Sequence, residues 1–183
     1  CAAPELAATQ TSWLLIITFG AIAVLGVRST VVVPVTVPDV TVETVEDVVA
    51  TVLLSAAIEI DGIIISNSTT DRPLTLQSSY QSEIGGLSGK PLFIRSTQML
   101  KKMYSLTNGQ IPLIGVGGIS NGVECYEKIK AGASLVQLYT ALVYQGPMII
   151  KKIKNEILSC LNTDGFKNIK EVVGISVWYL FLI

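Results

Sequence analysis

The stretch Ile111-Pro112-Leu113-Ile114-Gly115-Val116-Gly117-Gly118 decides the fold of this chain, because a short apolar run ends directly in glycines. Two further apolar runs also end directly in residues that can bind a ligand. Residues 61–65 lead into Ser66-Asn67-Ser68-Thr69, and residues 134–138 lead into Tyr139-Thr140. A helical pattern follows each run. Buried parallel strands that alternate with helices are typical of an α/β barrel or a doubly wound sheet, and in a barrel the chemistry lies where the strands end.

Composition narrows the function classes. The chain has 183 residues, enough for one domain with a core, whereas a complete (β/α)8 barrel typically needs about 250 residues. Its 13 basic and 14 acidic residues form no basic stripe, so nucleic acid is not an expected partner. The absence of histidine excludes His-based metal sites and Ser-His or Cys-His catalysis within this chain. Half of the residues are hydrophobic, which suggests a membrane surface or a missing partner segment.

The chain divides into three parts. Residues 1–30 form an atypical apolar segment, residues 31–174 carry the alternating pattern, and residues 175–183 form an apolar tail. The apolar run 13–27 is shorter than the ~20 residues that a membrane-spanning helix needs. A membrane anchor, a signal core, a buried helix and a segment foreign to this domain all stay open for it. The tail either packs on the domain or is foreign sequence.

Local signals predict further elements. The β-branched residues 31–37 indicate a strand that ends at Pro38-Asp39, and residues 60–65 form the next one. Residues 71–91 have no period and hold three glycines, which is typical of a functional loop. Helices are expected over residues 41–55, 96–107, 120–130 and from Gly146-Pro147 to Gly165, the last with the buried stripe Ile149, Ile150, Ile153, Ile157 and Leu161.

Two strand ends together predict a phosphate cradle. Glycines at positions 115, 117 and 118 let backbone N–H groups approach an anion, and the start of the following helix adds partial positive charge. Tyr139-Thr140 offers another N–H group and a hydroxyl. Because loops after the last two strands of a barrel often bind phosphate, we interpret Gly117, Gly118, Tyr139 and Thr140 as one cradle. Ordinary turn chemistry is the alternative.

The third strand end suggests a site for a planar polar ligand. Ser66-Asn67-Ser68-Thr69 offers amide and hydroxyl groups that can hold such a ligand, although helix capping or an Asx turn would use the same residues. The loop Gly85-Gly86-Leu87-Ser88-Gly89-Lys90-Pro91 can wrap closely around a ligand, with a flexible surface loop as the alternative.

These motifs resemble the last third of the dihydroorotate dehydrogenase family in order and spacing. The resemblance rests on residues 66–69, 85–92, 115–118 and 131–140 and extends over about residues 36–174. Lys90-Pro91-Leu92 and Gly146-Pro147 resemble the quinone-linked, membrane-associated class. The family resemblance implies an FMN-binding (β/α)8 TIM barrel, of which this chain holds the C-terminal part. It further implies oxidation of dihydroorotate to orotate in pyrimidine synthesis, a quinone as electron acceptor, and the mitochondrial inner membrane as location.

The resemblance also assigns roles to residues. Asn67 and Ser68 would bind the orotate ring. FMN would be held by Ser66, Gly89, Gly117, Gly118, Tyr139 and Thr140, with Gly118, Tyr139 and Thr140 around its phosphate. The quinone would lie near Tyr139, Leu142, Val143 and Pro147.

Two positions depart from the family pattern. The family's flavin-contacting lysine corresponds to Val35, which cannot supply a positive charge beside the flavin. No loop resembling the one that carries the family's catalytic serine precedes Val31, so no catalytic residue is assigned. Two alternatives to the enzyme therefore stay open. One is a non-catalytic, truncated or mistranslated product, and the other is a different FMN- or phosphate-binding barrel.

Overall fold

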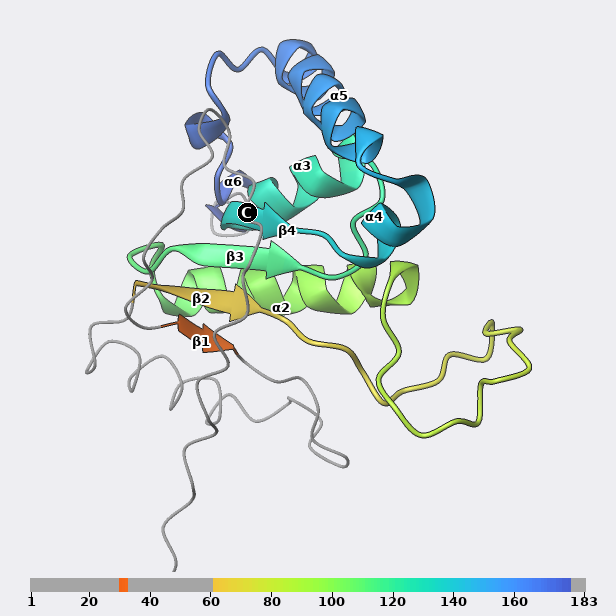
Figure 1. Ribbon diagram of the computed structural model, residues 1–183. Coiled ribbons are helices and arrows are strands. Elements are labelled where there is room, and N and C mark those ends of the chain that lie inside the picture. Colours follow the sequence, from red (N-terminus) through yellow and green to blue (C-terminus); the bar gives the residue numbers. More distant parts are fainter. Residues whose placement is uncertain (1–29, 33–60, 179–183) are drawn as a thin grey trace, which may run out of the picture.

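Four parallel strands form the centre of the computed structural model, which describes residues 30–32 and 61–178 (Figure 1). The strands pair in the order in which they follow along the chain, with no reversal. A doubly wound sheet reverses its strand order at a switch point, whereas a barrel adds each strand beside the one before it. The described strands, which match the barrel, are β1 (Thr30–Val32), β2 (Gly62–Ile65), β3 (Leu113–Val116) and β4 (Ala133–Gln137).

Helices cover the sheet in two layers. The helix α2 (Phe93–Leu106) packs on β2 and β3, and α3 (Gly122–Lys130) packs on β4. The long α5 (Met148–Asp164) then packs on the outer side of α3 (Figure 1). The shorter elements are the 3-10 turns η1 (Lys90–Leu92) and η2 (Ile169–Glu171) and the helices α4 (Thr140–Gln145) and α6 (Ile175–Trp178).

The core follows from the apolar runs. Ile63 and Ile65 have no exposed surface and Ile64 has 7%, so both faces of β2 are covered, as in a parallel sheet. The predicted stripe of α5 is confirmed, since Ile149, Ile153, Ile157 and Leu161 are buried and Ile150 is half-buried. Gly165 ends this helix in the left-handed conformation, with a φ of 78°.

Several element boundaries differ from those expected. The helix expected from residue 96 begins at Phe93, and Ser96 lies within its first turns, buried and hydrogen-bonded to the Leu92 carbonyl. The strand expected from Ile111 begins at Leu113, because Pro112 has no N–H group for a strand ladder. Its carbonyl still accepts a 3.0 Å hydrogen bond from Ile63. No sequence signal marks α4.

Other expectations concern residues that the structure does not describe. These are the apolar segment up to residue 29, the helix over 41–55, the later part of the strand over 31–37, and residues 179–183 of the tail. Val177, at the start of the tail, is buried, so this part packs on the domain. No helix in the described part of the chain is long and apolar enough to cross a membrane.

Candidate functional site

The carboxyl ends of β2, β3 and β4 line one cleft of about 210 Å³. Parallel strands end at the same edge of a barrel, and the loop before α2 joins them there (Figure 1). All of the residues predicted for substrate and cofactor lie together in the lining: Ser66, Asn67, Ser68, Gly89, Gly117, Gly118, Tyr139 and Thr140. Ser66 and Thr140 are 74 positions apart in the sequence, and the motifs that hold them thus meet at one cleft.

The glycine turn after β3 has two features of an anion site. Gly117 and Gly118 have φ values of 99° and 80°, and a side chain at Gly118 would come within 2.5 Å of the Phe93 backbone nitrogen. Among the described residues, no oxygen accepts a hydrogen bond from the amide N–H of Gly118 or Ile119. These two amides are therefore available to a ligand in the cleft.

The start of α3, in contrast, is occupied by the chain's own side chains. Asn121 caps the helix through a 2.8 Å bond from the Glu124 amide. The Glu124 carboxylate accepts from the amide and the hydroxyl of Ser120, and the Glu156 carboxylate accepts from the Gly122 amide. Two carboxylates thus already accept hydrogen bonds at the helix start that the sequence analysis expected to favour an anion, and that contribution stays a prediction.

The opposite side of the cleft is formed by α4 and the loop before α2. Thr140 is the first residue of α4, and its Oγ1 lies 3.3 Å from the Ser88 hydroxyl. A side chain at Gly89 would lie 3.1 Å from the Thr140 methyl group. Gly89 therefore permits the close approach of the loop to α4, and hydroxyl groups gather at this wall.

The strand end after β2 presents Asn67 to the cleft. Asn67 Oδ1 accepts a 2.8 Å bond from the amide of the next residue, Ser68, whereas an Asx turn would use the amide two residues on. Ser66 is 8% exposed, whereas Asn67 is exposed at the cleft. The bond from Ser68 orients the Asn67 side chain and leaves its amide NH2 group for a ligand.

Gln137 is a lining residue that the sequence analysis missed. It lies on β4, and its Nε2 is buried with no hydrogen-bond partner among the described residues. An unpaired buried amide is costly unless a ligand or water accepts from it. Within an apolar run, a single glutamine gives no sequence signal that distinguishes it from an ordinary strand residue.

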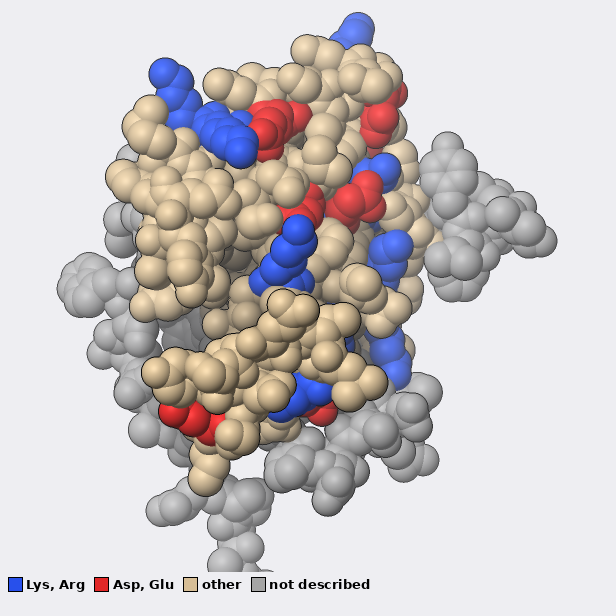
Figure 2. All heavy atoms as spheres, turned by 90° about the vertical axis from the view of Figure 1, so that its right-hand side faces the viewer, with Lys and Arg blue, Asp and Glu red and all other residues tan. Residues whose placement is uncertain are grey.

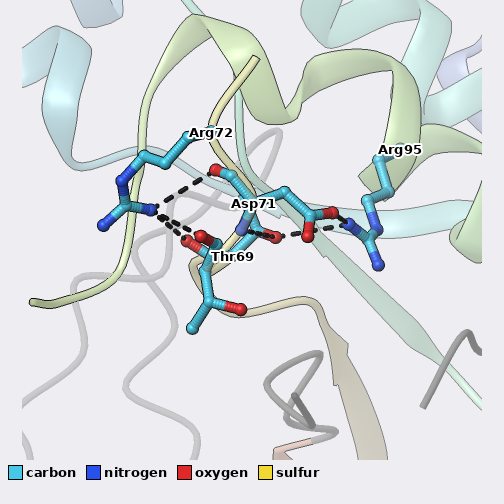
Figure 3. Close-up of polar contacts among 5 residues, drawn as sticks. Thr69, Asp71, Arg72 and Arg95 are labelled. Atoms are coloured by element: carbon cyan, nitrogen blue, oxygen red, sulfur yellow. Dashed lines mark hydrogen bonds and ion pairs between the residues drawn. The ribbon is translucent and has the colours of Figure 1, made fainter. Parts of the chain in front are cut away.

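The loop over residues 71–89 is held by two arginines that sequence reasoning also missed (Figure 3). Arg72 donates to the carbonyls of Thr70, Gln81, Glu83 and Gly85 at 2.8–3.1 Å. Thr69 and Leu87 form an antiparallel bridge that closes the base of the loop. The loop is therefore internally organised and not a free surface segment.

Arg95 ties this loop to α2. It forms an ion pair with Asp71 and a 3.3 Å hydrogen bond to the Thr69 hydroxyl (Figure 3). Both partners of the ion pair are well exposed, so its contribution to stability is small. Its effect is to fix the direction in which the chain leaves Thr69.

The residues predicted near the quinone lie beside the cleft. Tyr139 lines it and is 77% exposed, while Leu142, Val143 and Pro147 are not in the lining. Val143 is exposed on α4, and Pro147 precedes α5. The structure thus places these four residues on one short stretch of chain without forming a second cavity from them.

Comparison with known proteins shows which family the chain resembles. A family model described as dihydroorotate dehydrogenase matches residues 9–161. The chain belongs to the dihydroorotate dehydrogenase family. The match begins within the apolar segment 1–30, which the motif resemblance did not reach. Solved members of this family are TIM barrels, so β1–β4 are consecutive strands of that fold.

Two curated relatives and one solved structure illustrate the likeness. The mitochondrial dihydroorotate dehydrogenase (quinone) of Arabidopsis thaliana is 52% identical over 75% of this chain, and that of Mus musculus is 48% identical over 75%. A crystal structure of DHODH from Eimeria tenella in complex with ferulenol has a TM-score of 0.69 at 39% identity over 71% of this chain. The matches cover 29%, 34% and 34% of those proteins, so the chain spans about a third of their length.

Proposed function

We propose that the cleft is the C-terminal part of an FMN site in which dihydroorotate is oxidised to orotate, with a quinone as the electron acceptor. The observation that supports this most strongly is the convergence on one cleft of seven motif residues from three strand ends and of Gly89 from the loop before α2. Family membership and relatives named for the quinone-linked activity point to the same reaction.

The residues present fit FMN. The free amides of Gly118 and Ile119 suit a phosphate, and the unpaired amide of Gln137 suits a carbonyl or ring nitrogen acceptor. The cleft of about 210 Å³ is smaller than the 300–1,000 Å³ of typical complete cofactor sites. A partial site is what a chain that spans about a third of its relatives' length should have.

The groups at the cleft have separate tasks in this proposal. When bound, FMN accepts hydride from the substrate. Gly118 and Thr140 hold its phosphate, and Ser66 and Gly89 border its ring system. The Asn67 amide and the Ser68 hydroxyl orient the substrate ring through hydrogen bonds. The position of the family's lysine, Val35, lies outside the described residues, and no base is assigned in this chain.

The quinone and the membrane are proposed with the site. Tyr139, Leu142, Val143 and Pro147 border the route by which a quinone reaches the flavin. Tyr139, directly before α4, and Val143, on α4, are 77% and 65% exposed, so large hydrophobic side chains face solvent at that point. The mitochondrial relatives support the mitochondrial inner membrane as the location, with this surface against it.

A flavin titration tests the proposal. FMN fluorescence is followed while the purified chain is added, and dihydroorotate is then added without oxygen. We expect quenching of FMN fluorescence on binding, and bleaching of the yellow colour if the chain also turns over. Binding without bleaching would favour the non-catalytic alternative, for which Val35 in place of the lysine is the supporting observation. Absence of binding would contradict the site itself.

A further inference from the structure

Lys128 is a charged side chain without exposed surface, and it lies behind the glycine turn. Its Nζ donates to the hydroxyl of Ser96, which is itself 1% exposed. The same hydroxyl lies 3.1 Å from the Gly117 carbonyl oxygen and 2.7 Å from that of Leu92. A chain of polar contacts thus joins the lysine to the backbone of the turn.

The first turn of α2 forms the back wall of the glycine turn. A side chain at Gly117 would lie 3.1 Å from the Ser96 hydroxyl, and one at Gly118 would meet the Phe93 backbone. Little space separates the two segments, so a shift of Ser96 moves Gly117 as well. The amides of Gly118 and Ile119 follow directly in the chain.

Burying the ammonium group of Lys128 at this position costs free energy. Lysines are rarely fully buried, because the ammonium loses its hydration. The Phe93 ring lies 5.3 Å from Nζ, and Glu124 on the same helix favours the charged form, yet burial lowers the pKa of Lys128 from 10.5 to about 7. An apolar side chain would fill this space at lower cost, so packing alone does not explain a lysine here.

We propose that Lys128 is a positioning residue for the phosphate end of the cleft. Through Ser96 it holds the turn of Gly117 and Gly118 in place, and its ammonium adds positive charge behind that turn. The cleft therefore prefers a flavin that carries a phosphate to one that does not. This inference rests on the proposed FMN site and adds the residues that set its selectivity.

The test compares FMN with riboflavin, which lacks the phosphate. Dissociation constants for both are measured with the full chain and with Lys128→Met, Ser96→Ala and Lys130→Met. Lys130 is the matched control, because it lies on the same helix, pairs with Glu127 at 3.3 Å and does not line the cleft. We expect the preference for FMN to fall at least tenfold in the first two variants and to stay unchanged in the control. Equal preference in all four proteins would overturn the proposal.

A second measurement keeps the test decisive. The ¹⁵N relaxation of the Gly117 and Gly118 amides is measured in the chain without ligand, with α5 as the internal reference. A fall in the order parameters of both glycines in Ser96→Ala, with α5 unchanged, supports the positioning role, and unchanged order parameters contradict it. If Lys128→Met does not fold, Ser96→Ala decides. If the unaltered chain binds neither flavin, the proposed function fails, and the relaxation result alone decides whether these residues hold the turn.

Discussion

At the scale of single residues, Lys128 gives the chain a pH-dependent stability. Its pKa is about 7 in the folded chain against an ordinary 10.5, so the unfolded chain binds more protons above pH 7. The free energy of unfolding therefore rises with pH, by at most about 1.4 kcal/mol per unit. Burial also raises the pKa of Cys125 from 9.0 to about 12, so the thiol opposes the rise above pH 9.

Urea unfolding at pH 7 and pH 9 measures this effect. We expect the free energy of unfolding to increase by about 1–3 kcal/mol between these pH values, since Lys128 loses its buried charge over this range. Lys128→Met should lack the increase. If the free energy of unfolding of Lys128→Met rose as much as that of the unaltered chain, groups other than Lys128 would cause the pH dependence.

Asn67 provides a residue-scale test of the substrate end. Asn67→Ala removes an amide that the cleft presents to a ligand, and we expect orotate binding to weaken by about 1–3 kcal/mol, or roughly 5- to 150-fold. Isothermal titration with orotate, in the presence of FMN, measures it. Thr70→Ala is the matched control, because Thr70 is exposed and outside the cleft. If both variants bound orotate with equal affinity, Asn67 would not be part of the substrate site.

The residues of the site were predictable to different degrees. Gly117, Gly118, Asn67 and Thr140 follow apolar strands, and this position alone places them at one barrel edge. Lys128 and Gln137 were not predictable, because each stands in a pattern that fits an exposed helix face or a strand interior. Their importance comes from burial, which depends on the packing of α2 against β3 and α3.

At the scale of elements, the loop over residues 71–89 depends on Arg72. Its guanidinium bonds to carbonyls on both sides of the loop, at Thr70 and Gly85 among others. Arg72→Gln should release the loop, and we expect chymotrypsin to cut after the exposed Tyr80 at least tenfold faster. Lys101→Gln on α2 serves as the control. Unchanged cleavage would show that the Thr69–Leu87 bridge alone holds the loop.

The contact between α5 and α3 gives a second element-scale prediction. Ile157 is 1% exposed, so Ile157→Ala leaves a cavity and should lower the free energy of unfolding by about 2–5 kcal/mol. Leu158 is the next residue and is 58% exposed, so Leu158→Ala should have little effect. Urea unfolding of the two variants gives the comparison. Similar losses in both would contradict the burial of the predicted stripe.

Among the elements, α3 and α5 were predictable because caps and an apolar stripe mark them. Pro147 and Gly165 set the ends of α5 as expected, and Asn121 caps the start of α3. The start of α2 was misplaced, because its N-cap residue, Leu92, makes no side-chain cap hydrogen bond and gives no cap signal in the sequence. The short α4 has no cap hydrogen bond from a side chain and too few residues for a period to show.

At the scale of the whole molecule, the described strands are a part of a barrel. In the described sheet, β1 and β4 have one neighbour each, whereas every strand of a closed barrel has two. The face at which the strands end carries acidic and basic side chains that are interspersed (Figure 2). Its function therefore depends on the local chemistry of the cleft and not on a field of one sign.

The most direct test of the site is an NMR titration of the ¹⁵N-labelled chain with FMN. If neighbouring strand ends grip the phosphate, the amide signals of Gly118, Ile119 and Thr140 should shift together and saturate with one dissociation constant. Those of α5 should remain in place. Shifts confined to one strand end, or spread evenly over the molecule, would contradict a shared phosphate site.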